Sequence, residues 1–246
     1  MAGNVKGSVQ GSSKGNAKGN AKGDGRTTRW EKHRVDRRAE FVQAAIRAID
    51  ALGPEASVTD IAAEAGVSKP VIYRYFADKD ELYAAVGTWG AELVLDRVIT
   101  AVLAPATARD RVTAGVTAYL DTLAEHPAAF LLLIRHHAAG ADPVADGKTV
   151  IAAKLSRLLG DALRHLGGDA GAAEPWAHAI VGMGNSVGQW WLERRTMSRA
   201  TATTYLSDFI WHALSGAAEE YGVQLTALDP PPEVQPNVRP IRKEQA

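Results

Sequence analysis

The segment from Ser68 to Lys79 holds the side chains best suited to recognising a chemical partner. It reads SKPVIYRYFADK and mixes cationic and aromatic residues with an apolar set. Ile72, Tyr75 and Phe76 share one face at helical spacing and are expected to pack inward. The outward lysine, proline and valine suit double-stranded DNA, because lysine can donate to guanine O6 and N7 and the other two can contact a thymine methyl.

Short helices must hold this segment, and the sequence contains their start and stop signals. Thr59 is expected to cap a helix over residues 60–65, and Gly66 follows where a positive φ is needed. Ser68 is expected to cap a second helix with Pro70 in its first turn. Two short helices joined by a tight glycine turn form a helix-turn-helix, whose second helix can enter a major groove.

A third helix follows directly, with Asp78 as its expected cap and Glu81 completing a capping box. The alternative interpretation of these helices is a corner packed inside a helical bundle. That alternative does not explain the polar face that remains once the core positions are assigned. The side chains on this face are Lys69, Tyr73, Arg74 and Lys79.

The composition of the 246-residue chain limits its class. Hydrophobic residues make up 46% of it, which is enough for a sizeable core. The chain has no cysteine, which excludes disulfides, a thiolate nucleophile and a cysteine-based zinc site. No apolar run approaches about 18 residues, and the N-terminus has no apolar signal segment, so we expect no membrane span and a cytoplasmic protein.

The net charge of zero hides an asymmetry along the chain. Residues 1–38 contain ten lysines and arginines against three acidic residues, which gives +7 there and −7 beyond. Residues 1–28 are rich in small and polar residues and repeat KGNA from Lys14, so we expect a disordered basic arm. This arm is either a solubilising tail or a cationic segment that lies along DNA phosphates.

Helical periodicity runs through most of the remaining chain. Apolar stripes at helical spacing recur between Phe41 and Leu214, and no segment convincingly has the alternation of a strand. We therefore expect an all-α fold of about nine helices. The expected domains are the arm over 1–28, a helix-turn-helix DNA-binding domain over 29–80, a ligand-binding and dimerisation domain over 81–224, and an irregular proline-rich tail over 225–246.

The segment from Ser57 to Val86 closely resembles the DNA-binding domain of TetR-family transcriptional regulators. The resemblance implies a three-helix N-terminal domain, a larger helical ligand-binding domain and a homodimer. The arm before Trp30 is longer than the family requires. The matching motif residues are Ala62, Gly66 and Val67, followed by Tyr73, Tyr75, Phe76, Lys79 and Leu82.

The same resemblance implies roles for single residues of the helix-turn-helix. Those expected at base edges are Lys69, Pro70, Val71 and Tyr73. Those expected near phosphates are Thr59, Tyr75 and Lys79. Ser68 and Arg74 complete the set of candidate DNA-binding residues.

Beyond Trp89 the sequence offers candidates for an effector pocket rather than a motif. Aromatic residues could line a hydrophobic tunnel, and Asn185 and Gln189 share a face of an otherwise apolar helix. The alternative is that these two residues bridge a dimer and that the tryptophans are ordinary core. The ligand-binding candidates are Trp89, Tyr119, Phe130, Arg135, His178, Asn185, Gln189 and Trp190.

The stretch from Gly188 to Ala200 reads GQWWLERRTMSRA and resembles a subset of actinobacterial TetR-type regulators, several of which respond to fatty acyl-CoA. This resemblance implies a long-chain acyl-CoA as the effector. No cofactor is expected. His136 and His137 with Asp142 could suggest a metal site, but adjacent histidines point to different sides of a helix, so we expect none.

The last two helices of family members usually pair with their copies in a four-helix dimer interface, and the sequence fits this arrangement. Small residues allow close helix approach, and an apolar stripe would supply the contact surface. The interface candidates are Gly182, Ser186, Gly188, Leu206, Phe209, Ile210 and Leu214.

We therefore expect a ligand-responsive TetR-type repressor that binds a palindromic DNA operator as a homodimer and leaves it when a small apolar effector binds. A second class is a constitutive architectural DNA-binding protein, which would have a filled core where a ligand-regulated protein has a pocket. An all-α enzyme is the third class, but the sequence has no Gly-rich phosphate loop, nucleophile elbow or HExxH motif.

Overall fold

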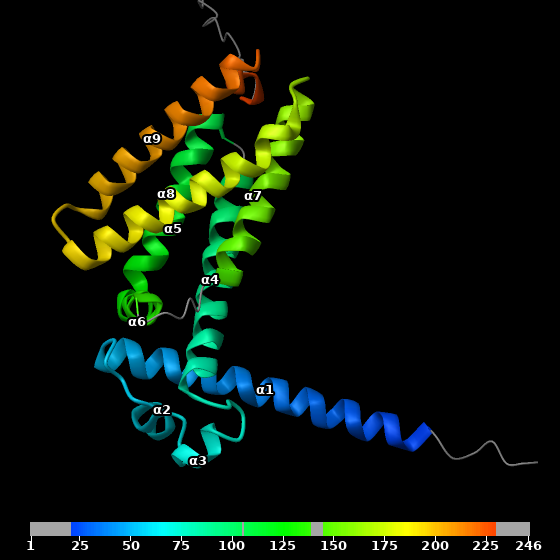
Figure 1. Cartoon of the computed structure of the whole chain (residues 1–246), viewed down its shortest axis with the longest axis vertical. Coiled ribbons are helices and arrows are strands. Elements are labelled where there is room, and N and C mark those ends of the chain that lie inside the picture. Colours follow the sequence, from blue (N-terminus) through cyan, green and yellow to red (C-terminus); the bar gives the residue numbers. More distant parts are fainter. Residues whose placement is uncertain (1–20, 105, 139–144, 230–246) are drawn as a thin grey trace, which may run out of the picture.

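The computed structural model describes residues 21–104, 106–138 and 145–229, and within these ranges the chain is helical without a strand (Figure 1). The expected all-α fold is confirmed. No helix in the described ranges is long and apolar enough to cross a membrane. The elements are α1 (Ala21–Leu52), α2 (Val58–Glu64), α3 (Lys69–Ile72), α4 (Lys79–Leu103), α5 (Ala108–Glu125), α6 (Pro127–Ala138), α7 (Ala145–His165), the 3-10 helix η1 (Ala170–Ala172), α8 (Ala173–Arg194), α9 (Arg199–Glu220) and the 3-10 helix η2 (Leu225–Leu228).

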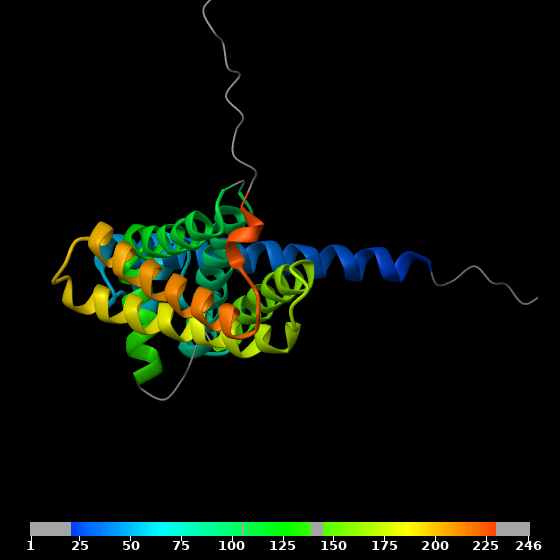
Figure 2. The same ribbon diagram turned by 90° about the horizontal axis from the view of Figure 1, so that it is seen from above.

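The helices form two groups that α4 connects. Figure 1 shows α1, α2 and α3 at one end of the molecule, while α5, α7, α8 and α9 lie at the other. The 25 residues of α4 run from the first group into the second, a length of about 37 Å. Seen from above in Figure 2, the second group is stacked over the first, and the N-terminal part of α1 extends beyond both.

The first hydrophobic cluster holds α1, α2, α3 and the start of α4 together. Phe41 and Ile49 of α1, Ile61 of α2 and Ile72 of α3 are all at most 1% exposed. This cluster also contains Ala129, Leu132 and Leu133, which belong to α6. The first group of helices therefore packs against α6, which follows α5 in the chain.

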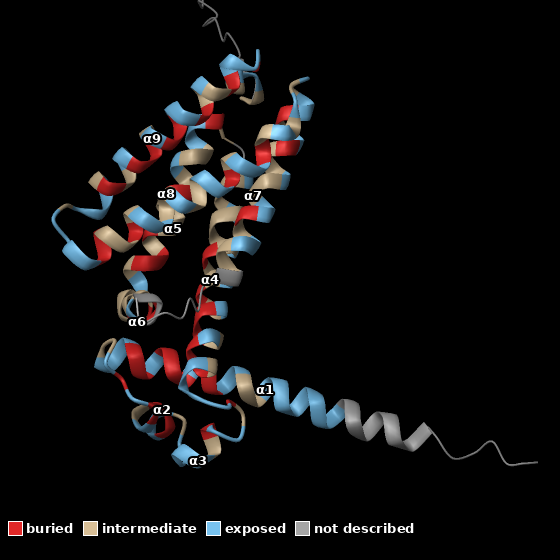
Figure 3. Ribbon diagram, in the orientation of Figure 1, coloured by how far each residue is buried: buried red, intermediate tan, exposed pale blue. Residues whose placement is uncertain are grey.

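The helix α1 begins inside the segment that was expected to be disordered. It starts at Ala21, so residues 21–28 are helical where a disordered arm was expected, whereas residues 1–20 lie outside the described part. Once the buried half of α1 is formed, each added residue gains a hydrogen bond without a new nucleation cost, and the helix can extend outward. The result is a projecting, exposed helix on which Trp30 is 78% exposed (Figure 3).

The cap of α2 differs from the expected one. Ser57, not Thr59, is the N-cap, and α2 begins at Val58. The Asp60 backbone N–H donates to Ser57 Oγ at 3.3 Å, and the Ser57 backbone N–H donates to Asp60 Oδ2 at 2.8 Å. This reciprocal pair is a capping box. It requires a side-chain acceptor three residues after the N-cap, and Ser57 has one in Asp60 whereas Thr59 is followed at that distance by Ala62. The hydrogen bonds from Ser57 lower the pKa of the Asp60 carboxyl.

An arginine on α1 fixes the junction between α3 and α4. Arg38 donates to the Tyr75 carbonyl at 2.6 Å and pairs with the Glu81 carboxylate at 2.8 Å. Glu81 also accepts from the Ala77 backbone N–H at 2.6 Å, one residue before the Asp78 cap. The Ala77 N–H and then Arg38 lower the pKa of the Glu81 carboxyl. The expected capping role of Asp78 is confirmed, since it accepts from the Glu81 N–H.

The C-terminal segment is ordered further than expected. Leu225–Leu228 form η2, so the expected irregular tail is wrong at its start. The Asp229 carboxylate accepts from the Ala108 backbone N–H at 2.5 Å, which ties η2 to the first residue of α5. Residues 230–246 lie outside the described part of the chain.

Candidate DNA-reading helix and ligand cavity

The turn between α2 and α3 presents α3 at the outer end of the molecule. Gly66 has φ +65°, as expected for the residue that ends α2. The Val67 N–H returns to the Ala62 carbonyl at 2.9 Å, which closes the turn tightly. Pro70 lies in the first turn of α3, where no N–H is required.

The side chains of α3 divide into a buried and an exposed set. Ile72 and Phe76 are at most 1% exposed and anchor α3 in the first cluster. Tyr73 is 39% exposed, and its ring lies 5.9 Å from Lys69 Nζ. The exposed candidates for DNA binding are Ser68, Lys69, Pro70, Tyr73 and Arg74. This face is polar, cationic and aromatic, as base and phosphate contacts require.

The four other DNA-binding candidates differ in how far their side chains are exposed. Val71 and Tyr75 are half-buried, and the Tyr75 ring packs edge-on against Phe41 at 5.1 Å. Tyr75 is therefore partly a core residue. Lys79 is exposed at the start of α4, with Nζ 5.0 Å from the Tyr83 ring. Thr59 is exposed in the first turn of α2, where it does not cap the helix.

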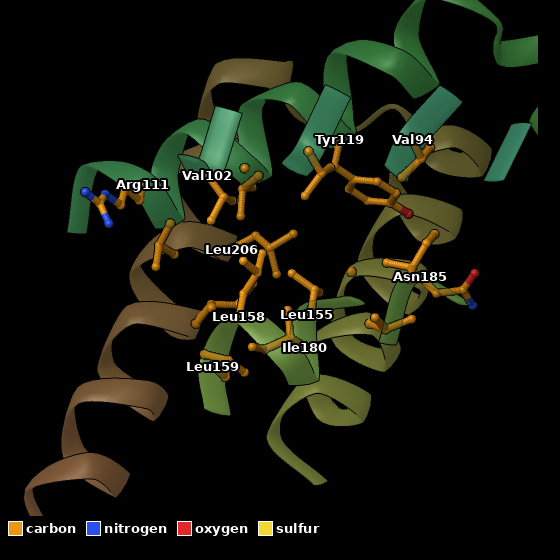
Figure 4. A pocket seen from close by; sticks show the side chains of 18 of the residues that line it. Val94, Val102, Arg111, Tyr119, Leu155, Leu158, Leu159, Ile180, Asn185 and Leu206 are labelled. Atoms are coloured by element: carbon orange, nitrogen blue, oxygen red, sulfur yellow. The ribbon is translucent and has the colours of Figure 1, made fainter. Parts of the chain in front are cut away.

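A cavity of about 530 Å³ lies in the second group of helices. Its walls come from α4, α5, α6, α7, α8 and α9, and η2 closes one end. Figure 4 shows Val102, Leu155, Leu158, Ile180 and Leu206 converging on its middle. The size and the aliphatic lining are typical of a site for a small apolar ligand.

Four of the eight ligand-binding candidates line this cavity, namely Tyr119, Phe130, Asn185 and Gln189. The other four do not. Trp89 packs edge-on against His126 at 5.1 Å, and Arg135 pairs with Glu55. His178 is exposed and Trp190 half-buried, both outside the lining. The aliphatic wall was not predicted, because its residues come from six helices that only the fold brings together.

Tyr119 reaches across the cavity to α8 because α8 has a glycine there. A methyl group at Gly188 would overlap the Tyr119 hydroxyl and lie 2.7 Å from Leu123. Burial raises the pKa of the Tyr119 hydroxyl. Gly188 is itself buried against α5, so it lies on the inner side of α8 and not on an exposed face where a dimer contact was expected.

The apolar stripe of α9 is also placed differently from the expectation. Leu206, Ile210 and Leu214 are buried in the chain's own second cluster and line the cavity, so they do not form an exposed surface. Phe209 is 65% exposed, together with Tyr205 one turn earlier at 64%. On α8, Gly182 and Ser186 are exposed.

Two elements connect the reading helix with the cavity. On α4, Leu82 and Val86 belong to the first cluster, while Val94 lines the cavity. On α6, Leu133 is buried in the first cluster and also lines the cavity. Phe130 is partly buried against the same cluster and lines the cavity as well. The wall of the cavity and the core that holds α3 therefore share these two helices.

Contacts at the corner between α5 and α6 join the same parts. His126 Nδ1 lies 2.8 Å from Asp50 Oδ2 on α1. Arg135 of α6 pairs with Glu55 in the connection from α1 to α2. Within the described residues, no group of three histidine, aspartate or glutamate side chains is placed to hold a metal ion. The side chains of His136, His137 and Asp142 lie outside that part.

We predict that Gly188→Ala disturbs the cavity wall whereas Gly184→Ala does not. A methyl group at Gly188 must displace Tyr119, an overpacking cost of about 1–3 kcal/mol. At Gly184, one turn earlier on the same helix, a methyl group would lie 3.8 Å from the same ring, and alanine should add up to about 1 kcal/mol of helix stability. Denaturant unfolding of both variants measures this. Equal stabilities would contradict the described packing of Tyr119.

Two family models match the chain. One, described as "Bacterial regulatory proteins, tetR family", covers residues 41–86, and the other, "Tetracyclin repressor-like, C-terminal domain", covers residues 97–225. The HTH-type transcriptional regulator Rv0472c of Mycobacterium tuberculosis is 36% identical over 201 residues, which are 81% of this chain and 86% of that protein. The HTH-type transcriptional activator FasR of Mycolicibacterium smegmatis is 28% identical over 185 residues, 74% of this chain and 84% of that protein.

A solved structure supports the fold. The regulator FadR of Bacillus subtilis in complex with stearoyl-CoA superposes with a TM-score of 0.56 at 15% identity, over 70% of this chain and 96% of that one. The helix-turn-helix at one end and the helical domain around a cavity at the other agree with both family models. The chain belongs to the TetR family of bacterial transcriptional regulators, which bind DNA and are not enzymes.

Proposed function

We propose that this protein is a ligand-responsive repressor that binds a palindromic operator as a homodimer and is released by a long-chain acyl effector. The observation that carries the proposal is the double position of α6. The same helix packs in the core of the reading head and lines the cavity. A ligand can shift an equilibrium only by binding two conformations unequally, and α6 offers a direct route for that difference.

For DNA, we propose that α3 enters the major groove with its N-terminal end. Lys69, Pro70, Val71 and Tyr73 would contact base edges, where the exposed lysine can donate to a guanine. Phosphate contacts would come from residues at the rim of this face, which carry no sequence information themselves. Those residues are Thr59, Ser68, Arg74, Tyr75 and Lys79.

For coupling, we propose that the effector moves α4 and α6 relative to α1. The helices α4 and α7 touch where Gly147 faces Ala91, so closely that a side chain at Gly147 would overlap Ala91. Movement of α7 would therefore be transmitted to α4 rather than absorbed. Since close-packed helices shift as units, the two reading heads of a dimer would change their spacing.

For the effector, the cavity supports a long alkyl chain. Its lining is mainly aliphatic, and burying each CH₂ group is worth about 0.8 kcal/mol. The structural neighbour FadR is named as a complex with stearoyl-CoA. The constitutive architectural protein is the second candidate, but it would have a filled core, and the cavity of about 530 Å³ speaks against it.

For the dimer, we propose that α8 and α9 pair with their copies. Tyr205 and Phe209 expose large side chains on α9, and α8 exposes the small residues Gly182 and Ser186. Two neighbouring exposed aromatic residues are typical of a surface that a partner covers. The interface would thus rest on the outer face of α9, not on its buried stripe.

Base contacts and phosphate contacts can be distinguished with an operator selected from a random DNA pool. Tyr73→Ala or Lys69→Ala should cost about 1–3 kcal/mol on the operator and little on random DNA. Lys79→Ala should weaken both and lower the slope of log affinity against log salt by about one unit. Lys154→Ala, exposed on α7, is the matched control. Equal losses on both DNAs for Tyr73→Ala would remove it from the base contacts.

The acyl effector is tested with stearoyl-CoA and free CoA. Stearoyl-CoA should raise the melting temperature, because a ligand at about one hundred times its Kd adds about 2.7 kcal/mol to stability. It should also weaken operator binding in a gel shift, whereas free CoA should do neither. If stearoyl-CoA leaves both readouts unchanged, the acyl effector is excluded while the DNA-binding proposal stands. A reporter gene downstream of the operator decides between repression and activation.

The dimer surface is tested by Phe209→Glu. The charge should prevent apolar pairing and yield a monomer with weak operator affinity, since two heads about one helical turn apart bind together. Sedimentation velocity gives the mass. The matched control is His212→Glu, which places the charge at an exposed position in the next turn of α9 and leaves the apolar rings of Tyr205 and Phe209 in place. A Phe209→Glu protein that remains dimeric would place the interface elsewhere.

A further inference from the structure

The cavity wall carries basic side chains but no acidic one. The lining contains the cations Arg111 and Lys148 together with His165, and no aspartate or glutamate. A positive charge beside an apolar cavity is unfavourable unless an anion or a hydrogen bond compensates it. Lys148 has an interaction of its own, whereas the lining offers Arg111 no aspartate or glutamate. The wall therefore favours a ligand that carries an anionic group.

Arg111 is the clearest sign of this imbalance. Its Nε is buried and has no hydrogen-bond partner among the described residues, whereas buried polar atoms usually have one. Arg109, two residues earlier on α5, pairs with Asp208 at 2.9 Å and lies outside the lining. The two arginines of the same helix end thus differ, and only the one without a described partner lines the cavity.

Arg111 and His165 share one end of the cavity. Asp229 ties η2 to the start of α5, and Val223, just before η2, packs against Gly168 after the end of α7. The start of α5, the end of α7 and η2 therefore meet. Leu225 and Leu228 of η2 line the cavity there. Lys148 lies 17 residues before His165 on the same helix, about 26 Å away.

The remaining wall leads from this end toward α6. In Figure 4, Arg111 and Asn185 lie at opposite ends, and the aliphatic side chains of Val102, Leu158 and Leu155 lie between them. Phe130 and Leu133 of α6 complete the lining. A chain anchored at Arg111 would thus run over an apolar surface toward the helix that packs against the reading head.

From this arrangement we propose an anionic-head subsite at Arg111 and His165, under η2. The inference rests on the proposed effector function and specifies it: the ligand is an anionic amphiphile, held by its carboxylate or phosphate at the η2 end, with its alkyl chain pointing toward α6. Binding is then set by the head and the chain together, while the end of the chain determines how far it presses on Phe130.

The test is calorimetry with three probes of one chain length: tetradecanoate, tetradecanoyl-CoA and tetradecanol. At least one anionic probe should bind about tenfold or more tightly than the alcohol, since hydrogen bonds to charged groups are the strong ones. The comparison of acid with CoA ester shows whether a carboxylate or a phosphate is recognised. Equal affinity of all three probes overturns the subsite.

The variants locate the subsite. Arg111→Gln should reduce the preference to about twofold and leave the alcohol unchanged, while Arg109→Gln should keep the full preference. His165 is exposed at the end of α7, and His165→Gln should lower the preference for the anionic probe several-fold. This second variant replaces Arg111→Gln if that protein does not fold. Equal behaviour of the Arg111 and Arg109 variants, or of wild type and His165→Gln, overturns the assignment. A preserved head preference with unchanged operator binding would sustain the subsite and contradict the regulatory proposal.

Discussion

The helix α6 packs in the core of the reading head and at the same time lines the cavity. Leu133 is 3% exposed, in contact with the core of the reading head, and yet it faces the cavity. Interiors are packed as densely as organic crystals, so such a residue cannot respond to one side without affecting the other. The single long helix α4 makes the same connection through the backbone. Both helices thus contact the core that holds α3 and the wall of the cavity.

The cavity and the reading helix place opposite demands on packing. A reading head must hold its side chains in one geometry, and the tight turn at Gly66, the buried Ile72 and the Arg38 contacts to Tyr75 and Glu81 supply that rigidity. A cavity forgoes packing contacts and costs stability, by about 24 cal/mol per Å³ in engineered cases. The two demands are met at opposite ends of the molecule, and α4 and α6 connect them.

The sequence allowed the local structure of the reading head to be predicted, because turn chemistry is local. Gly66, Pro70 and Asp78 each act where their backbone preferences require. Thr59 was chosen as a cap over Ser57, since both residue types cap helices, and the reciprocal bonds with Asp60 decide between them. The family motif could be recognised for the same reason, because its residues are close together in the chain.

The cavity and the dimer surface could not be predicted at the level of residues. A stripe such as Leu206, Ile210 and Leu214 shows that a helix face is covered, but not whether the same chain or a second copy covers it. The cavity wall is drawn from six helices and η2, and Arg111 has no local signal that marks it. Such features depend on contacts between distant segments, which periodicity does not specify.

A distance measurement shows whether a ligand in the cavity changes the separation of the two reading heads in a dimer. The chain has no cysteine, so Ala63→Cys, exposed on α2, gives one labelling position per protomer. Pulsed electron–electron double resonance between the two spin labels of a dimer would then be recorded with and without stearoyl-CoA. The ligand is expected to move the distance distribution away from the one measured on operator DNA. Release of DNA with an unchanged distribution would contradict this expectation.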